Sequence, residues 1–413
     1  MTPEEAERYV LSRELFGMRF GLDRMRRMMT ALGHPERQFE SIHVVGTNGK
    51  SSTTRMIAAI LAQHGLRTGA YLSPHLLSYS ERIRIDDADL EPGAFAAAVQ
   101  RVAHAADMVD RSLKKGERVT QFELLTASAY SELAAREVDV AVIEAGLGGR
   151  YDATNVIPSK VQVLTSVGLE HTRWLGPTIT AIAGEKLDVV QEGATLVLGA
   201  DLHPDAEVVA VAVADERHAR IVRAPADPGV AVAAPGTFQR RNFALARAAA
   251  EAYLGGSDQA AVGAAASSVR IPGRLQIVGE DPLVLVDGAH NPEGMAALAE
   301  SLPEIVGDRR PLVGVMSILD DKDAAHMLAT LLPECDAVVF TSSQNPRALP
   351  PPTLQSLASQ LSGPPAEVVP EPKAALARAR ELAGAGGAVV ISGSIYLIAD
   401  VLRPVSRDRV SAL

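Results

Sequence analysis

Apolar runs alternate along the chain with segments of helical periodicity. The first set of apolar runs lies at 42–45, 138–146, 161–171 and 195–200. An alanine-rich helical segment follows at 238–254, and 271–276 (IPGRLQ) then interrupts the pattern. The alternation restarts with apolar runs at 283–286, 311–316, 336–341, 366–370 and 388–392. This pattern predicts parallel α/β sheets in two domains, residues 1–270 and 271–413, with ligands bound between them.

One long stretch gives a different pattern. Residues 201–236 contain short valine-rich runs broken by charged residues and prolines. We expect short strands and turns there, and this stretch offers no candidate chemistry.

The first apolar run leads into a glycine-rich turn within IHVVGTNGKSSTT (42–54). A phosphate site requires backbone N–H groups, a cation and a helix N-terminus, and this turn can supply all three. The candidate loop residues are Gly46, Thr47, Asn48, Gly49, Lys50, Ser51 and Ser52. The usual phosphate loop is G-x-x-x-x-G-K-[ST], but Val44 replaces its first glycine. The segment is therefore either a nucleotide loop or a strand-to-helix turn that carries a lysine.

Two later apolar runs end in side chains that can bind a metal. Glu144 lies at the end of one run, and His171 ends another. Ligands gather at the carboxyl ends of parallel strands, so both side chains are expected to face whatever Lys50 holds. Magnesium prefers oxygen ligands, which suits Glu144 better than His171. The alternatives are a solvated acid in a turn for Glu144 and a hydrogen-bonded structural histidine for His171.

Other candidate residues are open to two interpretations each. Lys186 is either a solvated helix residue or a lysine near the metal whose unprotonated amine can be modified. Ser73 lies in a proline-bounded turn that is either a polar loop or a ligand site. Arg274 at the domain junction either reaches a phosphate or forms a salt bridge. Asp287 and His290 occupy a strand-to-helix turn, where helix capping is the alternative role for an aspartate.

Composition narrows the classes of partner. The chain has 413 residues, of which 47% are hydrophobic and 22% are charged, with a net charge of −10. No basic block outweighs the acidic background, which argues against a nucleic-acid partner. Cys335 is the only cysteine, which excludes an internal disulfide and a cysteine zinc site. The sequence has no apolar signal core and no membrane-length apolar window. We expect a cytoplasmic protein with small-molecule substrates and no membrane partner.

The motifs together resemble the folylpolyglutamate synthase and dihydrofolate synthase family of the Mur ligase superfamily. They follow the family's order over nearly the whole chain: GLDRM (21–25), GTNGK (46–50), SPHL (73–76), ERI (81–83), TQFELLTASAY (120–130), EAGLGGRYDATNV (144–156), GLEHTRWLG (168–176), AGEK (183–186), IPGR (271–274), DGAHNPEG (287–294), DDKD (320–323), TSSQNPRA (341–348) and SGSIYL (392–397). The resemblance implies a P-loop-containing parallel-sheet ATPase domain followed by a smaller Rossmann-like glutamate-ligase domain.

The resemblance also implies a reaction. ATP phosphorylates the carboxylate of a pteroate or the γ-carboxylate of a folate, and the amine of L-glutamate displaces the phosphate to form an amide. The cofactors it implies are ATP and Mg²⁺, with a monovalent cation as a further candidate. The expected partners are these small molecules, and the chain is expected to be a monomer.

Site residues follow from the matching motif positions. Nucleotide contacts are implied for loop residues 46–52 and for Asn242, Arg274, Asp287 and His290. A magnesium site is implied for Ser73, Glu144, His171 and Lys186, with Lys186 carbamylated by carbon dioxide. Catalytic roles are implied for Lys50, Lys186, His171 and Arg274, and substrate contacts for Phe122 and Arg82. The sequence departs from the family at Ser51, Phe238 and Gln121, where relatives commonly carry glycine, histidine and an aromatic residue.

Two other functions remain alternatives. A peptidoglycan-precursor Mur ligase would need an N-terminal domain of roughly a hundred residues, but only 45 residues precede Gly46. A non-catalytic nucleotide-binding regulator would not need the set Lys50, Glu144, His171 and Lys186. Phosphate release that depends on both glutamate and a folate discriminates a ligase from a regulator.

Overall fold

The structure is a computed structural model that describes residues 1–13 and 21–403. It comprises two compact units. The first unit consists of Met1–Ala233 and Gln239–Val269. The second consists of Ala234–Phe238 and Arg270–Leu413.

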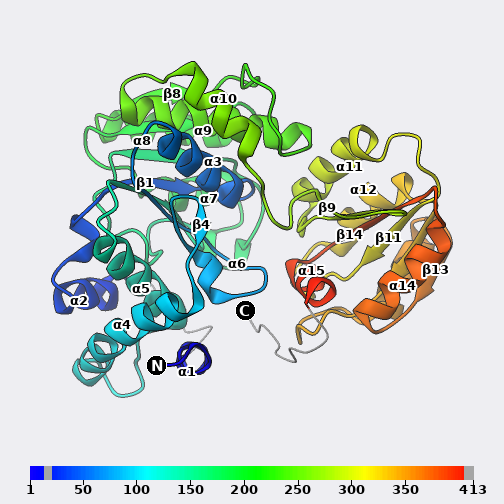
Figure 1. Cartoon of the computed structure of the whole chain (residues 1–413), viewed down its shortest axis with the longest axis horizontal. Coiled ribbons are helices and arrows are strands. Elements are labelled where there is room, and N and C mark those ends of the chain that lie inside the picture. The colour runs from blue at the N-terminus through cyan, green and yellow to red at the C-terminus, as the bar shows by residue number, and fades with distance from the viewer. Residues whose placement is uncertain (14–20, 404–413) are drawn as a thin grey trace. The chain divides into compact units, whose positions relative to one another are not determined.

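The first unit is built on an eight-stranded sheet of order β4-β3-β2-β5-β1-β6-β7-β8 (Figure 1). Its strands are β1 (Glu40–Val45), β2 (Thr68–Tyr71), β3 (Ile83–Ile85), β4 (Ala88–Asp89), β5 (Val140–Glu144), β6 (Val161–Leu164), β7 (Thr195–Leu198) and β8 (Arg220–Arg223). The six strands from β2 to β8 in this order are parallel, whereas β3 and β4 are antiparallel to their neighbours. The carboxyl ends of the parallel strands therefore meet along one edge of the sheet.

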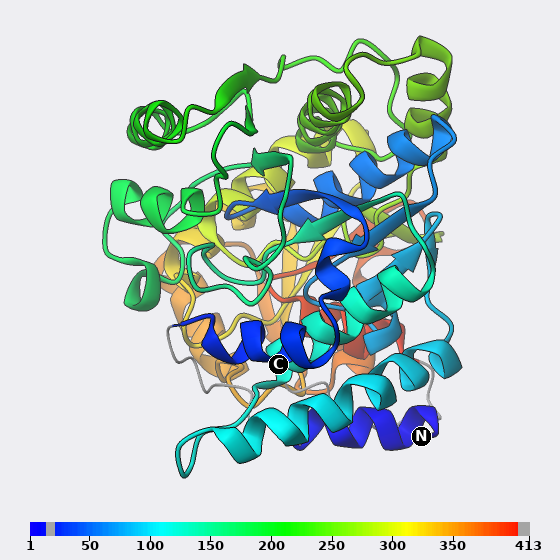
Figure 2. The ribbon, with the colours of Figure 1, turned by 90° about the vertical axis from the view of Figure 1, so that its left-hand side faces the viewer.

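Helices cover this sheet. Their bounds are α1 (Pro3–Leu11), α2 (Asp23–Ala31), α3 (Lys50–Gln63), α4 (Pro92–Ser112), α5 (Gln121–Ala135), α6 (Thr172–Leu175), α7 (Ile179–Leu187), α8 (Pro204–Glu216), α9 (Thr237–Leu254) and α10 (Gln259–Ser268), with 3-10 turns η1 (Pro35–Arg37) and η2 (Tyr79–Arg82). Side chains of α1, α2, α4 and α5 share one apolar core with β2 and β5. Figure 2 shows α1 beside α4. Arg13, which follows α1, pairs with Asp107 of α4 at 2.8 Å. Side chains of α7 and α8 form a second core with β6 and β7.

The second unit contains a six-stranded sheet of order β13-β12-β11-β14-β10-β9, in which β9 alone is antiparallel to its neighbour. The strands are β9 (Gln276–Glu280), β10 (Leu283–Val286), β11 (Leu312–Met316), β12 (Ala337–Phe340), β13 (Ala366–Val368) and β14 (Ala388–Ser392). The helices are α11 (Pro292–Val306), α12 (Ala324–Leu331), α13 (Pro351–Gln360), α14 (Pro372–Ala383) and α15 (Ile395–Leu402), with the 3-10 turn η3 (Leu332–Glu334). Residues of α11, α12 and α13 pack with β10, β11 and β12 in one apolar core.

One local prediction is wrong. Residues 201–236 were expected to form only strands and turns, but Pro204–Glu216 forms the helix α8. Ala206, Ala210 and Ala214 are buried at a spacing of four residues, which gives this helix an apolar stripe despite its β-branched valines. The helix also begins favourably, with a proline in its first turn and the His203 side chain accepting from the amide of Asp205.

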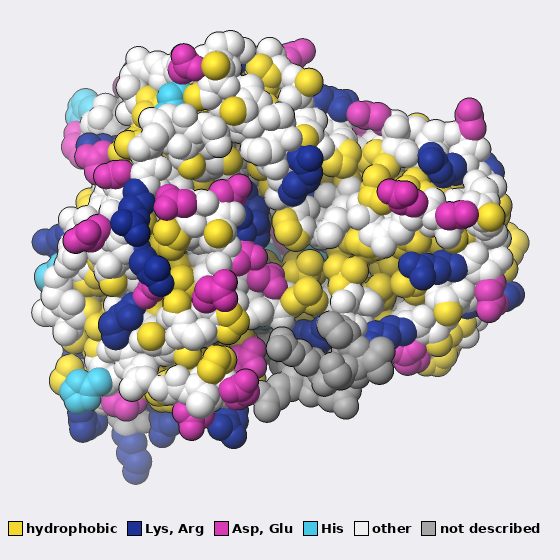
Figure 3. All heavy atoms as spheres, in the orientation of Figure 1, with side chains coloured by type: hydrophobic (Ala, Val, Ile, Leu, Met, Phe, Trp, Pro, Cys, Tyr) yellow, Lys and Arg dark blue, Asp and Glu magenta, His cyan; other side chains and the backbone are white. Residues whose placement is uncertain are grey.

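Charged side chains of both signs are interspersed on the face shown in Figure 3. This mixed surface agrees with the acidic net charge of −10 and shows no continuous basic stripe on that face. Among residues 1–13 and 21–403, no helix has the length and apolar character that crossing a bilayer requires.

Candidate functional site

The glycine-rich turn joins β1 to α3 at the carboxyl edge of the first sheet. Gly46 and Gly49 have φ angles of 152° and 84°. A Cβ atom at Gly46 would lie 1.9 Å from Thr165 Oγ1, and one at Gly49 would lie 2.6 Å from Asn242 Oδ1. Both positions therefore require glycine, because the backbone conformation and the close neighbours leave no room for a side chain. The predicted nucleotide residue Asn242 thus lies directly against the turn.

Hydrogen bonds to the segment after β6 hold the turn in place. The amide of Thr47 donates to Ser166 O at 2.9 Å, and the amide of Asn48 donates to Ser166 Oγ at 2.9 Å. Thr165 Oγ1 donates to Asn48 O at 2.6 Å. The first helical bond of α3 runs from the Thr53 amide to Gly49 O at 2.9 Å. The amides of residues 49–52 therefore form the helix N-terminus, where an anion is favoured.

Two lysines converge on one carbonyl of this turn. Lys50 Nζ donates to Gly46 O at 3.1 Å and to Thr47 O at 3.1 Å, and Lys186 Nζ donates to Gly46 O at 2.7 Å. Lys186 is only 4% exposed, so the interpretation of it as a solvated helix residue is wrong. Burial, reinforced by the positive charge of Lys50, lowers the pKa of Lys186 to about 7. A large share of Lys186 side chains are therefore neutral amines near neutral pH.

Glu144 ends β5 beside the start of α3. Its carboxylate is 1% exposed, so the alternative of a solvated acid is wrong. Ser51 Oγ donates to Glu144 Oε1 at 2.8 Å, and the amide of Ser73 donates to Glu144 Oε2 at 3.1 Å. The structure thus brings three of the predicted residues together, and Ser51 is the loop serine that faces the carboxylate.

His171 is placed differently from expectation. We expected it to end a strand, but β6 ends at Leu164 and His171 is the N-cap residue of α6. The strand stops early because Thr165 and Ser166 turn to bond the glycine-rich loop. The His171 side chain is 39% exposed, with Nε2 4.0 Å from Glu170 Oε1.

Oxygen donors at the turn suit magnesium. Glu144 offers a carboxylate, and Ser51 and Ser73 offer hydroxyls, a donor set that fits an ion that retains several waters. Within the ranges 1–13 and 21–403, no group of three or more His, Cys, Asp or Glu side chains lies together as a metal cluster. A magnesium site here would therefore rely on few protein ligands together with phosphate and water oxygens.

The loop after Glu144 lies between two predicted site residues. A Cβ atom at Gly146 would lie 2.6 Å from Phe122 Cζ, so the backbone of this loop rests on the Phe122 ring. A Cβ atom at Gly149 would lie 2.5 Å from Lys186 O, and the amide of Arg150 donates to Glu185 O at 2.8 Å. The loop is thereby fitted against α5 on one side and α7 on the other.

Sequence reasoning did not single out the acid that closes this loop. Asp152 is buried, and its Oδ2 accepts from the amide of Leu147 at 2.8 Å. Its Oδ1 accepts from the amide of Thr154 at 3.0 Å. Burial raises the pKa of Asp152, and the hydrogen bonds it accepts oppose this rise. The available signal was its position: an acid in a glycine-rich turn that follows a strand end.

Arg82 lies in the interior. It is 2% exposed, and its Nε donates to His75 Nδ1 at 3.1 Å. Its guanidinium carbon lies 5.6 Å from the centroid of the Tyr79 ring. The positive charge of Arg82 also acts on the buried hydroxyl of Tyr71, whose ring centroid lies 6.2 Å from that of Phe122. Arg82 is thus connected to the surroundings of Phe122 through one buried tyrosine.

Three predicted residues meet in a turn of the second unit, between β10 and α11. Asp287 accepts from the amides of Leu275 at 2.9 Å and Ala289 at 2.8 Å, and burial raises its pKa. A Cβ atom at Gly288 would lie 3.1 Å from Arg274 Nη1, and His290 Nδ1 lies 2.8 Å from Gly288 O. The helix cap is Asn291, whose Oδ1 accepts from Gly294 N at 2.8 Å, so helix capping is not the role of Asp287.

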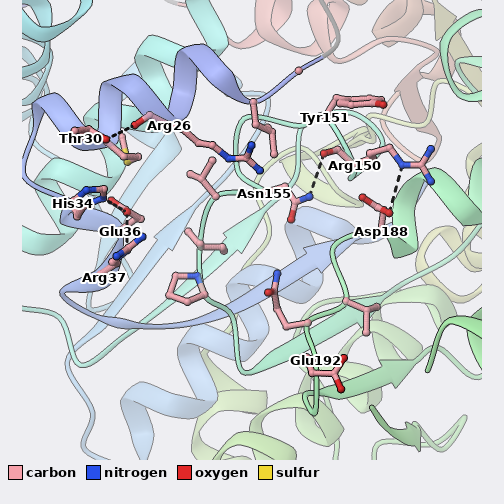
Figure 4. A pocket seen from close by; sticks show the side chains of 18 of the residues that line it. Arg26, Thr30, His34, Glu36, Arg37, Arg150, Tyr151, Asn155, Asp188 and Glu192 are labelled. Atoms are coloured by element: carbon pink, nitrogen blue, oxygen red, sulfur yellow. Dashed lines mark hydrogen bonds and ion pairs between the residues drawn. The ribbon is translucent and has the colours of Figure 1, made fainter. Parts of the chain in front are cut away.

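A cavity of about 1130 Å³ lies at the opposite edge of the first sheet (Figure 4). Its walls include residues that precede β1, β6, β7 and β8, among them Arg37, Pro158, Glu192 and Arg217. The cavity contains none of the predicted site residues and is not part of the candidate site.

Comparisons with known proteins agree with this geometry. The family model for the Mur ligase, glutamate ligase domain, matches residues 273–395. The dihydrofolate synthase/folylpolyglutamate synthase of Mycobacterium tuberculosis is 37% identical over 382 residues, which are 83% of this chain and 78% of that protein. A crystal structure of Mycobacterium tuberculosis folylpolyglutamate synthase complexed with ADP and AMPPCP superposes with a TM-score of 0.90 at 33% identity, covering 98% of each chain.

A further solved structure contains a metal ion. The bifunctional folylpolyglutamate synthase/dihydrofolate synthase of Yersinia pestis, complexed with AMPPNP and a manganese ion, superposes with a TM-score of 0.84 at 28% identity. The match covers 97% of each chain. From the sequence identity and the extent of these matches, the chain belongs to the dihydrofolate synthase/folylpolyglutamate synthase family.

Proposed function

We propose that this protein is an ATP-dependent ligase that joins L-glutamate to the carboxylate of dihydropteroate, to the γ-carboxylate of a tetrahydrofolate, or to both. The observation that carries the proposal is the convergence of Lys50 and Lys186 on the carbonyl of Gly46 at the N-terminus of α3. The names of the relatives, which act on folates, support the same substrate class.

The chemistry explains why a carboxylate ligase needs a phosphate site. A carboxylate is a poor electrophile, and phosphorylation by ATP gives an acyl phosphate whose phosphate leaves readily. The glutamate amine then attacks the acyl carbon, the C–N bond forms, the C–O bond to phosphate breaks, and the amine loses a proton. Phosphoryl transfer depends mainly on alignment and charge neutralisation. Lys50 and the amides at the start of α3 would supply both, with Asn242, Arg274, Asp287 and His290 as further nucleotide contacts.

The metal is proposed to be magnesium, held by Ser73, Glu144, His171 and Lys186. When bound, magnesium neutralises charge on the phosphate oxygens. Of these residues, Glu144 contributes a buried carboxylate already oriented by Ser51 and by the Ser73 amide. The lowered pKa of Lys186 suits carbamylation, because the unprotonated amine is the form that reacts: its nitrogen bonds the carbon of CO₂, a proton is released, and an anionic oxygen donor results. A monovalent cation is a further candidate ligand of the site.

The acceptor is proposed to bind beside Phe122. Its partly exposed ring lies against the backbone of Gly146 and offers a surface on which a pterin ring can stack. Arg82 would assist from within, through its positive charge beside the buried Tyr71. We further expect the enzyme to be a cytoplasmic monomer.

The test is a mass-spectrometric assay of the purified protein with ATP, magnesium and L-glutamate, and with dihydropteroate or tetrahydrofolate as acceptor. We expect a product that is heavier by one glutamyl residue with at least one acceptor, and its mass identifies which acceptor is used. Lys50→Met should abolish the product, whereas Lys115→Met, at an exposed lysine, is the matched control. Binding of ATP without any glutamyl product from either acceptor would favour a nucleotide-binding regulator and overturn the proposal.

A further inference from the structure

A buried chain of hydrogen bonds connects β1 to the loop that follows Glu144. His43 on β1 is fully buried, and its Nε2 lies 2.9 Å from Thr154 Oγ1. Thr154 Oγ1 in turn donates to Asp152 Oδ1. Tyr130 OH on α5 donates to Thr154 O at 2.9 Å, so Thr154 is fixed through both its side chain and its backbone. We refer to His43, Thr154 and Asp152 as the relay.

The direction of each hydrogen bond follows from counting protons. A threonine hydroxyl has one proton and can donate only one hydrogen bond. Thr154 donates this hydrogen bond to the carboxylate of Asp152. The hydroxyl must then accept from His43, so Nε2 carries the ring proton. Nδ1 is left as an acceptor, and within the described residues it has no hydrogen-bond partner. Burial lowers the pKa of His43 to about 3, so the ring remains neutral and keeps this single tautomer.

The far end of the relay holds the turn that touches Phe122. Asp152 accepts from the amide of Leu147, the residue that follows Gly146, at 2.8 Å. Gly146 is the residue whose backbone rests on the Phe122 ring. If Asp152 rotates, the Leu147 amide loses its acceptor and the turn is free to move relative to the ring. The nucleotide loop does not depend on this turn, because it is bonded separately to Thr165 and Ser166.

We propose that His43 and Thr154 are positioning residues for the acceptor site, acting through Asp152 to hold the Gly146–Leu147 turn against Phe122. This inference rests on the proposed function, in which the acceptor binds beside Phe122. His43 and Thr154 are both fully buried, so they would position the acceptor surface from behind. Disruption of the relay should therefore weaken acceptor binding more than nucleotide binding.

The experiment compares Thr154→Val, which removes the hydroxyl at nearly constant volume, with Thr154→Ser, which retains it. Thr154→Val should raise KM for the acceptor by about five- to tenfold, the size expected from one buried hydrogen bond. KM for ATP and kcat should change by less than about twofold, a split that a general loss of stability would not produce. Thr68→Val is the matched control, because Thr68 is 1% exposed and its hydroxyl has no partner within the described ranges.

A second measurement separates this inference from the proposed function. Hydrogen exchange of a peptide covering residues 144–154, in protein without ligands, should be faster in Thr154→Val than in wild type, Thr154→Ser or Thr68→Val. If wild-type protein ligates no glutamate, the proposed function and the acceptor role both fail, while exchange still decides whether the relay holds the turn. Unchanged exchange, or equal changes in KM for ATP and acceptor, would overturn the inference.

Two variants at His43 test the relay independently of Thr154→Val. If Thr154→Val does not fold, His43→Leu removes the donor at the other end of the relay and His43→Gln retains one. His43→Leu should then show the raised acceptor KM and the faster exchange, and His43→Gln should lie closer to wild type. The same values for both His43 variants would also contradict the relay.

Discussion

The buried lysine at the glycine-rich turn makes a quantitative prediction about stability. Lys186 is 4% exposed and shares the Gly46 carbonyl with Lys50, and burial lowers its pKa from 10.5 to about 7. Glu170 and Asp152 carry negative charge that partly opposes this shift. In the unfolded chain the amine takes up its proton below about pH 10.4, so between about pH 7 and pH 10 the native state binds one proton fewer. The free energy of unfolding should therefore rise with pH across this window.

Lys186→Met removes the titrating group and replaces it with an unbranched apolar side chain that is one atom shorter. Each pKa unit corresponds to about 1.36 kcal/mol, so a shift of about 3.5 units destabilises the folded wild type by about 5 kcal/mol below pH 7. Between pH 7 and pH 9 the free energy of unfolding of wild type should rise by about 2.3 kcal/mol, because half of the Lys186 amines are already neutral at pH 7. The variant should be more stable than wild type at pH 7, and this advantage should shrink by about 2 kcal/mol at pH 9.

Urea unfolding of both proteins at pH 6, 7, 8 and 9, without nucleotide or divalent cations, measures this difference. Lys115→Met controls for the loss of one lysine at an exposed position. A Lys186→Met difference that stays constant within about 0.5 kcal/mol over this range would refute the reasoning. It would mean that Lys186 titrates alike in the folded and unfolded chains.

Three further substitutions test other parts of the site. Gly46→Ala places a Cβ atom 1.9 Å from Thr165 Oγ1 and should distort the turn. Calorimetry should show ADP affinity falling by at least about tenfold while the circular dichroism spectrum is unchanged, and unaltered affinity would exclude this turn as the nucleotide site. Glu144→Gln keeps the size of the side chain but removes its charge, so turnover should fall by at least about tenfold and respond less steeply to magnesium; an unchanged magnesium titration would contradict the metal assignment. The pKa of His43 is lowered to about 3, so the free energy of unfolding of wild type should fall by about 2 kcal/mol between pH 6.5 and pH 5, a loss that His43→Gln should lack. Parallel pH profiles of the unfolding free energy for the two proteins would argue against a neutral buried ring.

The sequence predicted the buried framework well because its signal is local. The apolar runs at 42–45, 311–316 and 388–392 fall on β1, β11 and β14, whose side chains are almost all buried. The phosphate-loop pattern likewise fell between β1 and α3, where Gly46 and Gly49 adopt conformations suited to glycine. A strand or turn of this kind is specified by neighbouring residues, so its pattern can be recognised in one sequence.

The misplaced features depend on contacts between distant residues. His171 does not end a strand because Thr165 and Ser166 leave β6 to bond a turn more than a hundred residues earlier in the chain. The helix α8 was missed because valines favour strands, while its buried alanines identify a helical face only once the packing is known. The relay from His43 was missed for the same reason, since His43 on β1 lies more than a hundred residues from Asp152 and Thr154 in the loop after β5.

The central claim is that this site activates a carboxylate by transferring a phosphoryl group to it. The most direct test supplies an acceptor whose carboxylate oxygens are labelled with ¹⁸O, together with ATP, magnesium and L-glutamate, and analyses the released phosphate by mass spectrometry. We predict that each released phosphate carries one ¹⁸O atom, because the C–O bond of the acyl phosphate breaks when the amide forms. Unlabelled phosphate released together with glutamylated product, or AMP and pyrophosphate in place of ADP and phosphate, would contradict the account.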